Sequence, residues 1–295
     1  MHTTAIIDIG SNTIVLVIYQ IDDTGLHQLY YQSIAAHLVA CIHDHKMSDE
    51  GLQKAQNIIR GYLEKCQDMH VSEIYGDVTE CGRNLINQEA FLSAIKEAGL
   101  ENVRLLTGEE EAMCDFYGTS LDRTVHDGLM IDIGGGSTEF VSFAKDRILD
   151  AVSIPLGCVR LSTMAPDPQI SETEIEKMRT IHPQMLNSPT AIGVGGTIRA
   201  CRKTVEAVTG SSQARFFTAD LLALYEGLKK EDPFWQKAAK ENVTPDRLPV
   251  LVPGLGMLAA AAKSFGIQEF VSSDYGVREG FLLHFVLKRI LEKEE

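Results

Sequence analysis

Two stretches of the sequence join an aspartate to a turn of small polar residues, a combination that can bind phosphate. The first is AIIDIGSNT, residues 5–13, and the second is LMIDIGGGSTE, residues 129–139. Glycine and asparagine tolerate positive φ, so such turns can point several backbone N–H groups into one concavity. A carboxylate beside that concavity can hold the divalent cation that accompanies phosphate. The alternative interpretation is a pair of ordinary buried hairpins.

Two further segments carry groups suited to phosphate chemistry. GEEEA, residues 108–112, opens an expected helix with three glutamates. Neighbouring like charges raise a carboxyl pKa, which suits a general base near neutrality, although acids at a helix start also complement the helix dipole. GVGGTIR, residues 193–199, follows an expected strand and opens a helix whose N-terminus could bind phosphate. A tight strand-to-helix turn accounts for this second segment equally well.

The elements that must position these residues are repeated along the chain. Apolar and β-branched runs predict strands in the first two dozen residues and over 26–35, 73–78 and 103–106. Helices are expected from Ser48 to about Met69, over 87–98 and from Thr107 onward. The second half begins again with strands over 128–133, 138–143 and 147–154, followed by strands over 190–194 and 268–273.

Helices of the second half are expected after a capping box at residues 171–174, from Gly195, over the apolar run 248–262, and at the C-terminus. Three strands followed by alternating helices and strands, twice over, predict an α/β protein with mixed sheets. We expect an N-terminal domain over residues 1–124 and a C-terminal domain over 125–278. The last helix, about 279–295, would pack back on the N-terminal domain.

Composition excludes several classes of protein. The chain has 295 residues, 44% of them hydrophobic, and a formal net charge of −14. Nucleic acids and anionic membranes attract basic surfaces, so neither is an expected partner. The six cysteines form no closely spaced pair, and no signal peptide or membrane span is evident. These features favour a soluble cytoplasmic protein with free thiols.

Six motifs occur in an order that resembles one family, the exopolyphosphatases and guanosine pentaphosphate phosphohydrolases. They are DIGSNT (8–13), GEEEA (108–112), IDIGGGSTE (131–139), PLGCVR (155–160), GVGGT (193–197) and SDYGVREG (273–280). The resemblance spans nearly the whole chain. It implies two actin-like (ribonuclease H-like) domains with a cleft between them, in a short form that lacks the C-terminal helical domains of some members.

The resemblance also implies roles for particular residues. Glu111 would be the catalytic base that deprotonates the attacking water, and Arg83 would stabilise charge on the reacting phosphoryl group. Asp132 and Glu139 would bind Mg²⁺ or Mn²⁺, with Asp8 reaching the metal through water or else capping its own turn. The expected phosphate-binding residues are Ser11, Asn12, Thr13, Gly134, Gly135, Gly136, Ser137, Thr138, Gly195, Gly196 and Thr197.

The chain departs from the family pattern at two places. Glu80 and Cys81 stand where the family usually shows serine and alanine, and His37 stands where an arginine is common. These departures bear on the preferred substrate and leave the expected fold unchanged.

The expected activity is release of terminal orthophosphate from inorganic polyphosphate by in-line attack of water. Short chains are expected because the protein is acidic and lacks the added domains. The alternatives are hydrolysis of guanosine pentaphosphate and a non-catalytic sensor of nucleotide or polyphosphate. A homodimer is the default expectation for a soluble enzyme of this size.

Overall fold

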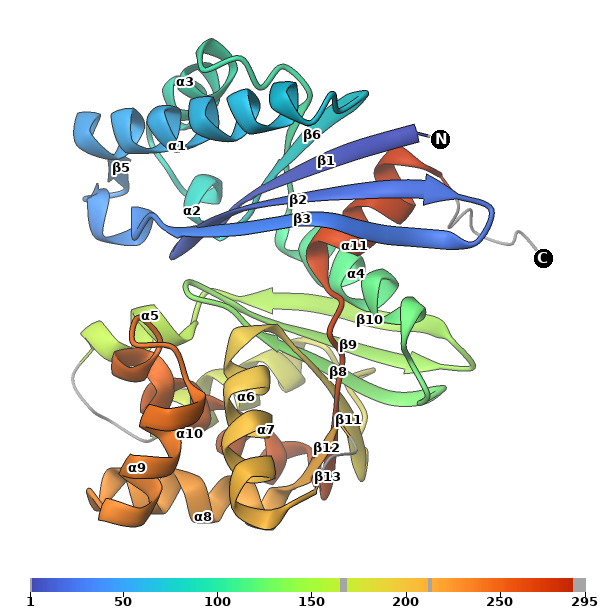
Figure 1. Ribbon diagram of the computed structural model, residues 1–295. Helices are drawn as coiled ribbons and strands as arrows, with labels where there is room; N and C mark the ends of the chain where they lie inside the picture. The colour runs from blue at the N-terminus through green and yellow to red at the C-terminus, as the bar shows by residue number, and fades with distance from the viewer. Residues whose placement is uncertain (1, 165–168, 212–213, 289–295) are drawn as a thin grey trace. The chain divides into compact units, whose positions relative to one another are not determined.

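The computed structural model describes residues 2–164, 169–211 and 214–288. The chain divides into two compact units, residues 1–107 and 108–295 (Figure 1). We call them the N-terminal and C-terminal units and describe each by itself. The domain boundary expected at residue 124 and the packing of the terminal helix on the first domain stay predictions. Residues 289–295 of that helix lie outside the described residues.

The N-terminal unit is built on a five-stranded mixed sheet in the order β3-β2-β1-β6-β7. Strands β1, β2 and β3 form an antiparallel meander, and β1, β6 and β7 run parallel. The strands are β1 (His2–Ile9), β2 (Thr13–Asp22), β3 (Gly25–Ala35), β6 (Glu73–Val78) and β7 (Val103–Leu105), with a small ribbon of β4 (Ile42–His43) and β5 (Lys46–Met47). The helical segments are η1 (Leu38–Cys41), α1 (Asp49–Asp68), α2 (Glu80–Arg83) and α3 (Gln88–Glu97).

The C-terminal unit is built on a six-stranded mixed sheet in the order β10-β9-β8-β11-β13-β12. Its strands are β8 (Asp127–Ile133), β9 (Thr138–Ala144), β10 (Arg147–Ile154), β11 (Thr190–Val194), β12 (Arg215–Phe217) and β13 (Glu269–Ser272). Its helical segments are α4 (Gly108–Gly118), η2 (Thr119–Leu121), α5 (Cys158–Thr163), α6 (Gln169–Ile181), α7 (Gly195–Thr209), α8 (Thr218–Lys229), α9 (Pro233–Asn242), α10 (Leu248–Phe265), α11 (Val277–Phe281) and η3 (Leu282–Val286).

The two sheets share one topology. The meander β1-β2-β3 corresponds to β8-β9-β10, and the parallel strands β6 and β7 correspond to β11 and β13. The turns that close the first hairpins are also alike: Gly10 N–H donates to Thr13 O at 3.0 Å, and Gly134 N–H donates to Ser137 O at 3.0 Å. The predicted repetition and the mixed α/β architecture are therefore confirmed.

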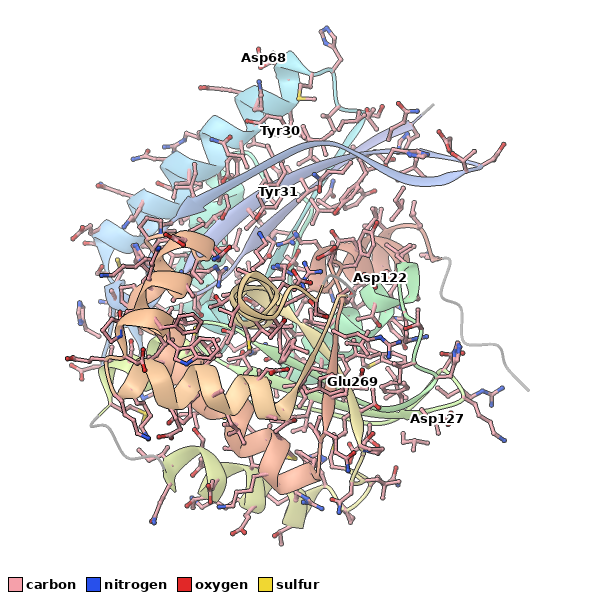
Figure 2. The ribbon with its side chains drawn as sticks, turned by 60° about the horizontal axis from the view of Figure 1, so that its bottom comes forward. Tyr30, Tyr31, Asp68, Asp122, Asp127 and Glu269 are labelled. Carbon is pink, nitrogen blue, oxygen red and sulfur yellow. The ribbon has the colours of Figure 1, made fainter. Side chains whose placement is uncertain are left out.

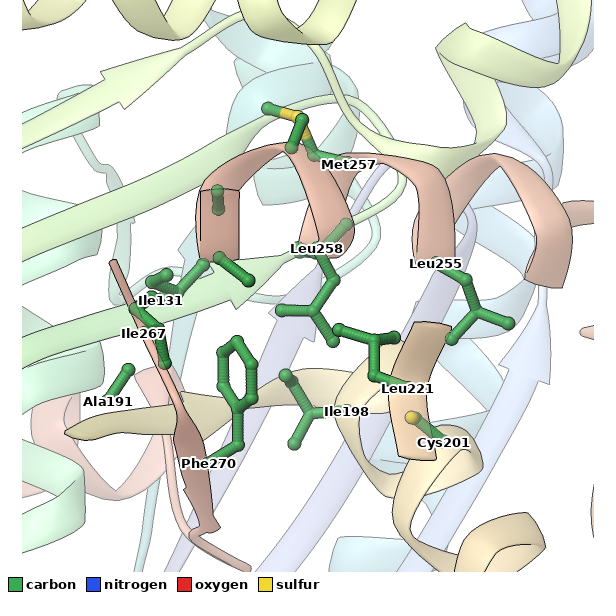
Figure 3. Packing of buried hydrophobic residues seen from close by; sticks show 14 of the residues in the cluster. Ile131, Ala191, Ile198, Cys201, Leu221, Leu255, Met257, Leu258, Ile267 and Phe270 are labelled. Carbon is green, nitrogen blue, oxygen red and sulfur yellow. The ribbon is translucent and has the colours of Figure 1, made fainter. Parts of the chain in front are cut away.

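Each sheet buries an apolar face against helices. In the N-terminal unit, alternate residues of β1 and β2 pack with α1 and α3, since side chains along a strand point to opposite faces. In the C-terminal unit, one face of the sheet packs against α6, α7, α8 and α10. Figure 3 shows Leu258 of α10 near Leu221 of α8 and Ile198 of α7, with Phe270 of β13 beside Ile198. The opposite face of this sheet packs against α4.

Two local expectations meet different outcomes. Ser48 caps α1 by accepting a hydrogen bond from Gly51 N–H at 3.2 Å, as the sequence predicts. The capping box expected at Ser171 is wrong, because α6 already includes Gln169 and Ser171 lies buried inside the helix.

Helix α10 is long and apolar enough to cross a membrane by length and composition alone. Half of that segment is buried in the protein, and α10 packs against α5, α6 and α8. The helix enters through Pro249 and keeps Pro253 inside. It is thus the central core helix of the C-terminal unit, as the apolar run predicts.

Candidate active site

Four carboxylates converge between α4 and the C-terminal sheet, and strand alternation explains two of them. Met130 and Val141 belong to the core beneath α4. Asp132 lies two residues beyond Met130 on β8, and Glu139 lies two residues before Val141 on β9. Side chains two residues apart share a face of a sheet, so Asp132 and Glu139 both face α4.

The strand register brings these two acids together. Asp132 and Glu139 are direct partners in the antiparallel pair β8–β9. Directly opposite residues of such a pair carry their β-carbons about 5 Å apart. On the other side of Glu139, its partner Ser153 on β10 donates its hydroxyl to Glu139 Oε1 at 2.7 Å. Asp132 and Glu139 therefore lie next to each other, as the sequence predicts. Metal binding by this pair stays a prediction.

Helix α4 supplies the other two carboxylates. Glu111 and Asp115 are one turn apart on this helix and are only 9% and 1% exposed. A β-carbon on Gly108 would lie 2.6 Å from the β-carbon of Ser153, so glycine allows the first turn of α4 to approach β10 closely. This approach places Glu111 within electrostatic range of Glu139, and Asp115 within range of Asp132.

The other end of α4 is fixed by a glycine-mediated contact. A side chain on Gly118 would overlap the carbonyl of Gly276, and one on Gly280 would overlap the carbonyl of Cys114. Helices α4 and α11 thus touch backbone to backbone. Glu279 further shapes the start of α11, because its carboxylate accepts a hydrogen bond from Gly276 N–H at 2.9 Å. These contacts give Gly118, Gly276, Glu279 and Gly280 a structural role.

The loop between β13 and α11 is anchored by Asp122, which is labelled in Figure 2. Its carboxylate accepts from the Ser273 hydroxyl at 2.7 Å and from Asp274 N–H at 2.9 Å. This ties the end of η2 to the segment that leads into α11. The position of α4 is therefore set at both of its ends.

Burial and mutual repulsion perturb the acid cluster. Burial, followed by the charges of Asp132, Glu139 and Glu111, raises the pKa of Asp115 well above its usual value. Burial, followed by Glu111 and Asp132, also raises the pKa of Glu139 well above its usual value, although hydrogen bonds from Ser137 and Ser153 oppose the rise. Neither oxygen of Asp115 accepts a hydrogen bond from another described residue.

Arginines oppose this accumulation of negative charge at Asp132. Burial raises the pKa of Asp132, while the charges of Arg199, Arg247 and Arg278 lower it. The three arginines come from α7, from the residue before α10, and from α11. A carboxylate surrounded by cations can stay ionised despite its burial.

The glycine pair at the start of α7 lets two charged groups approach this site. Gly195 has φ 86°, and a β-carbon there would overlap the carboxylate of Asp132. A β-carbon on Gly196 would overlap the guanidinium of Arg247. Thr197 donates its hydroxyl to Ile133 O at 3.3 Å, which holds the start of α7 to the end of β8. The predicted loop 195–197 therefore lies beside the acid cluster.

The glycine turn after β8 is also close to these groups. Gly134 O accepts from Cys158 N–H at 2.9 Å, and Gly135 O accepts from Val159 N–H at 2.9 Å and from Arg160 N–H at 3.2 Å. Backbone N–H groups at the N-terminus of α5 thus donate hydrogen bonds to the carbonyl oxygens of the turn. Thr138 donates its hydroxyl to Leu156 O at 2.7 Å, so its side chain has a structural partner.

The remaining predicted residues lie in the N-terminal unit. Ser11, Asn12 and Thr13 form the turn between β1 and β2, in the position that the glycine turn occupies between β8 and β9. Asp8 is 9% exposed at the position that corresponds to Asp132. The register partner of Asp8 is Val15, whereas that of Asp132 is Glu139. The acidic pair therefore exists in one hairpin only.

Arg83 is the last residue of α2 in the N-terminal unit, and it is partly buried. Glu111 belongs to the C-terminal unit. A joint role of Arg83 and Glu111 in one reaction therefore stays a prediction.

The donor set of the C-terminal unit fits a hard cation. Carboxylate oxygens are what Mg²⁺ and Mn²⁺ prefer, and one or two carboxylates commonly suffice when phosphate oxygens and water complete the shell. Asp132 Oδ1 accepts no hydrogen bond from an N–H or hydroxyl group of the described residues, and its carboxylate shares a hydrogen bond with the carboxyl group of Asp115. Within the described part of the chain, no group of three or more His, Cys, Asp or Glu side chains is arranged to hold a metal ion. The site thus suits a cation that brings its phosphate ligands with it.

Two residues of the site escaped the sequence analysis. Asp115 lies four residues after Glu111, and this spacing on a helix was a usable signal. Arg247 carried no such signal, because only the tertiary structure brings it to Gly196.

Solved structures with similar folds define the class of protein. A Ppx/GppA family member from Aquifex aeolicus superposes with a TM-score of 0.77 at 23% identity, covering 99% of each chain. An exopolyphosphatase from Cytophaga hutchinsonii superposes with a TM-score of 0.82 at 20% identity, covering 97% of this chain and 98% of that one. The chain therefore has the actin-like ATPase fold of these proteins.

The family follows from sequence comparison. The model of the Ppx/GppA phosphatase family matches residues 17–289, and this protein belongs to that family. A putative exopolyphosphatase of Haemophilus influenzae is 25% identical over 292 residues, covering 94% of this chain and 90% of the relative. Exopolyphosphatase 1 of Mycobacterium tuberculosis is 26% identical over 307 residues, covering 94% and 86%.

Proposed function

We propose that this protein hydrolyses phosphoanhydride bonds and releases terminal orthophosphate from inorganic polyphosphate, with short chains preferred. The observation that carries the proposal is the cluster of Glu111, Asp132 and Glu139 beside the glycine loops of β8–β9 and β11–α7. Family membership and relatives named exopolyphosphatases support the same reaction.

In this proposal Glu111 accepts the proton of the attacking water. Its burial on α4 would keep the carboxylate away from bulk solvent and oriented toward the reacting group. Backbone N–H groups of residues 134–136 and 195–196, with Ser137 and Thr197, would donate to phosphate oxygens. Arg247 joins this set because its guanidinium lies against the 195–196 loop.

Asp132 and Glu139 would hold Mg²⁺ or Mn²⁺. A cation bound there supplies charge neutralisation of the phosphate oxygens as the bond to the leaving group breaks. Asp8 and Arg83, with Ser11, Asn12 and Thr13, are assigned to the same substrate by family resemblance. Substitution of each of these residues, followed by measurement of phosphate release, tests its assignment.

Several properties of the chain support a cytoplasmic enzyme that acts on a small anionic substrate. All six cysteines are free, and five of them are buried. The net charge of −14 disfavours long polyanions, which would need an extended basic surface.

Phosphate release from a substrate panel tests the proposal. Triphosphate, long-chain polyphosphate and guanosine pentaphosphate are each incubated with the purified protein, with Mg²⁺ and with a chelator. We expect Mg²⁺-dependent release, fastest with triphosphate. Release from guanosine pentaphosphate alone would favour that alternative substrate. Binding of these compounds without any release would identify a sensor and contradict the proposal.

A further inference from the structure

Ser153 of β10 contacts two parts of the acid cluster in the C-terminal unit. Its hydroxyl donates to Glu139 Oε1 at 2.7 Å, and the two residues are direct partners in the antiparallel pair β9–β10. The β-carbon of Ser153 also lies 2.6 Å from the place that a β-carbon on Gly108 would take. Ser153 therefore lies against Glu139 and against the first turn of α4, which carries Glu111.

An irregularity in β10 aims Ser153 at this face of the sheet. The register with β9 shifts between Ile148 and Asp150, so Leu149 is an extra residue in β10. Ile148 and Ala151, three residues apart, consequently both pack in the core beneath α4. In a regular strand, residues on one face are two apart, and Ser153 would point away from α4. Bulges next to active sites commonly re-aim a side chain in this way.

The end of β10 is held in a fixed place. Thr138 of β9 donates its hydroxyl to Leu156 O at 2.7 Å, just after the end of β10. A β-carbon on Gly157 would lie 2.5 Å from the carbonyl oxygen of Gly135, so this segment lies directly against the glycine turn. The hydroxyl of Ser153 thus belongs to a rigid part of the sheet, which suits a group that orients another side chain.

A second hydroxyl, that of Ser137, also donates to the carboxylate of Glu139. In the proposed function Ser137 donates to phosphate. A hydroxyl has one O–H to donate, so Ser137 cannot serve phosphate and Glu139 at the same time. Ser153 would then keep Glu139 oriented while substrate is bound. Hydrogen-bond partners of metal ligands commonly have this function.

We propose that Ser153 is a positioning residue, which holds the carboxylate of Glu139 in the orientation that binds Mg²⁺ and thereby favours Mg²⁺ over Ca²⁺. Mg²⁺ demands nearly ideal octahedral geometry, whereas Ca²⁺ accepts a more variable set of oxygens, often both oxygens of one carboxylate. A carboxylate fixed by a hydroxyl group on one oxygen suits the stricter ion. This inference rests on the proposed function and deepens it, because it names a residue that tunes the metal site.

Cation affinities of substituted proteins test this role. Ser153→Ala removes the donor, and Ser153→Cys nearly keeps the size of the side chain but supplies only a weak donor. Dissociation constants for Mg²⁺ and Ca²⁺ are measured by titration calorimetry on the purified protein without substrate. We expect both variants to bind Mg²⁺ about 10–100-fold more weakly and to bind Ca²⁺ with much less change.

The Mg²⁺ dependence of phosphate release separates positioning from a purely structural role. If Ser153 acts through Glu139, Ser153→Ala should raise the Mg²⁺ concentration needed for half-maximal release from triphosphate. Saturating Mg²⁺ should then restore most of the wild-type rate. If Ser153 only supports α4 through its contact with Gly108, the rate should fall at every Mg²⁺ concentration, and the inference would be wrong.

Ser142→Ala is the matched control. Ser142 is a buried serine of β9, three residues after Glu139, and so lies on the opposite face of the sheet. This substitution should alter neither dissociation constant. Unchanged Mg²⁺ affinity in Ser153→Ala and Ser153→Cys, or an equal loss of affinity for both cations, would overturn the inference alone. Absence of both Mg²⁺ binding and Mg²⁺-dependent phosphate release in the wild-type protein would overturn the proposed function with it.

Discussion

The carboxylate of Asp132 occupies the space beside Gly195 in which any other residue would place its β-carbon. The two residues come from β8 and from the start of α7, so this contact joins two of the loops that surround the acid cluster. Gly195 is required here for two reasons. It adopts φ 86°, which L side chains rarely adopt, and it lacks the atom that would displace Asp132.

Gly195→Ala should therefore disturb the site as well as the fold. Gly210→Ala is a matched control, because Gly210 has φ 73° at the end of α7 but nothing within 4 Å of its missing β-carbon. We expect Gly210→Ala to lower the free energy of unfolding by about 1 kcal/mol and to leave phosphate release unchanged. Gly195→Ala should cost about 1–3 kcal/mol more and abolish phosphate release. Equal effects of the two substitutions, measured by denaturant unfolding and phosphate assay, would show that the contact with Asp132 is unimportant.

The buried carboxyl group of Asp115 should make the protein less stable as the pH rises. Its pKa is raised well above the usual 3.8 in the folded protein, so the folded state binds this proton more tightly than the unfolded state does. The contribution to stability is fully present below the unfolded pKa and is lost as pH rises through the folded pKa. Each unit of difference corresponds to about 1.4 kcal/mol.

Asp115→Asn should remove this loss, because asparagine stays neutral. The variant should be more stable than the wild type at neutral and alkaline pH, and the advantage should vanish near pH 4. Thermal unfolding in the absence of divalent cations, followed across that range, measures the difference. A constant difference at every pH would contradict the role assigned to burial of the charge.

Mg²⁺ should stabilise the protein through the Asp132–Glu139 pair. A cation that binds the folded state alone raises its stability by mass action, by about 2.7 kcal/mol at a hundred times the dissociation constant. We expect an upward shift of the melting temperature on addition of Mg²⁺ and its reversal by a chelator. Glu139→Gln should reduce the shift strongly, whereas Glu176→Gln, at an exposed position on α6, should keep it. An undiminished shift in Glu139→Gln would place the cation elsewhere.

The fold and half of the site could be predicted because their signals are local. Alternation and turn residues located β8, β9 and β10, and the repeat of Asp-Ile-Gly indicated two related units. The pairing of Asp132 with Glu139 follows from a hairpin whose turn closes at Gly134 and Ser137. Short sequence separation made this pair predictable.

Other features depend on contacts that no local pattern contains. Arg247 reaches Gly196, and Ser11 reaches Glu80, across 51 and 69 residues of sequence respectively. The departure at Glu80 was visible in the sequence, but its partner was not. The prediction of a capping box at Ser171 was wrong because α6 already includes Gln169, two residues before that motif.

Phosphate release by Glu111→Gln tests the central claim most directly. Glutamine keeps the shape of the side chain on α4 but cannot accept the proton of the attacking water. With triphosphate and Mg²⁺, we predict at least a hundredfold slower release of orthophosphate, with unchanged circular dichroism and substrate affinity. Release at the wild-type rate would contradict the assignment of Glu111 as the catalytic base.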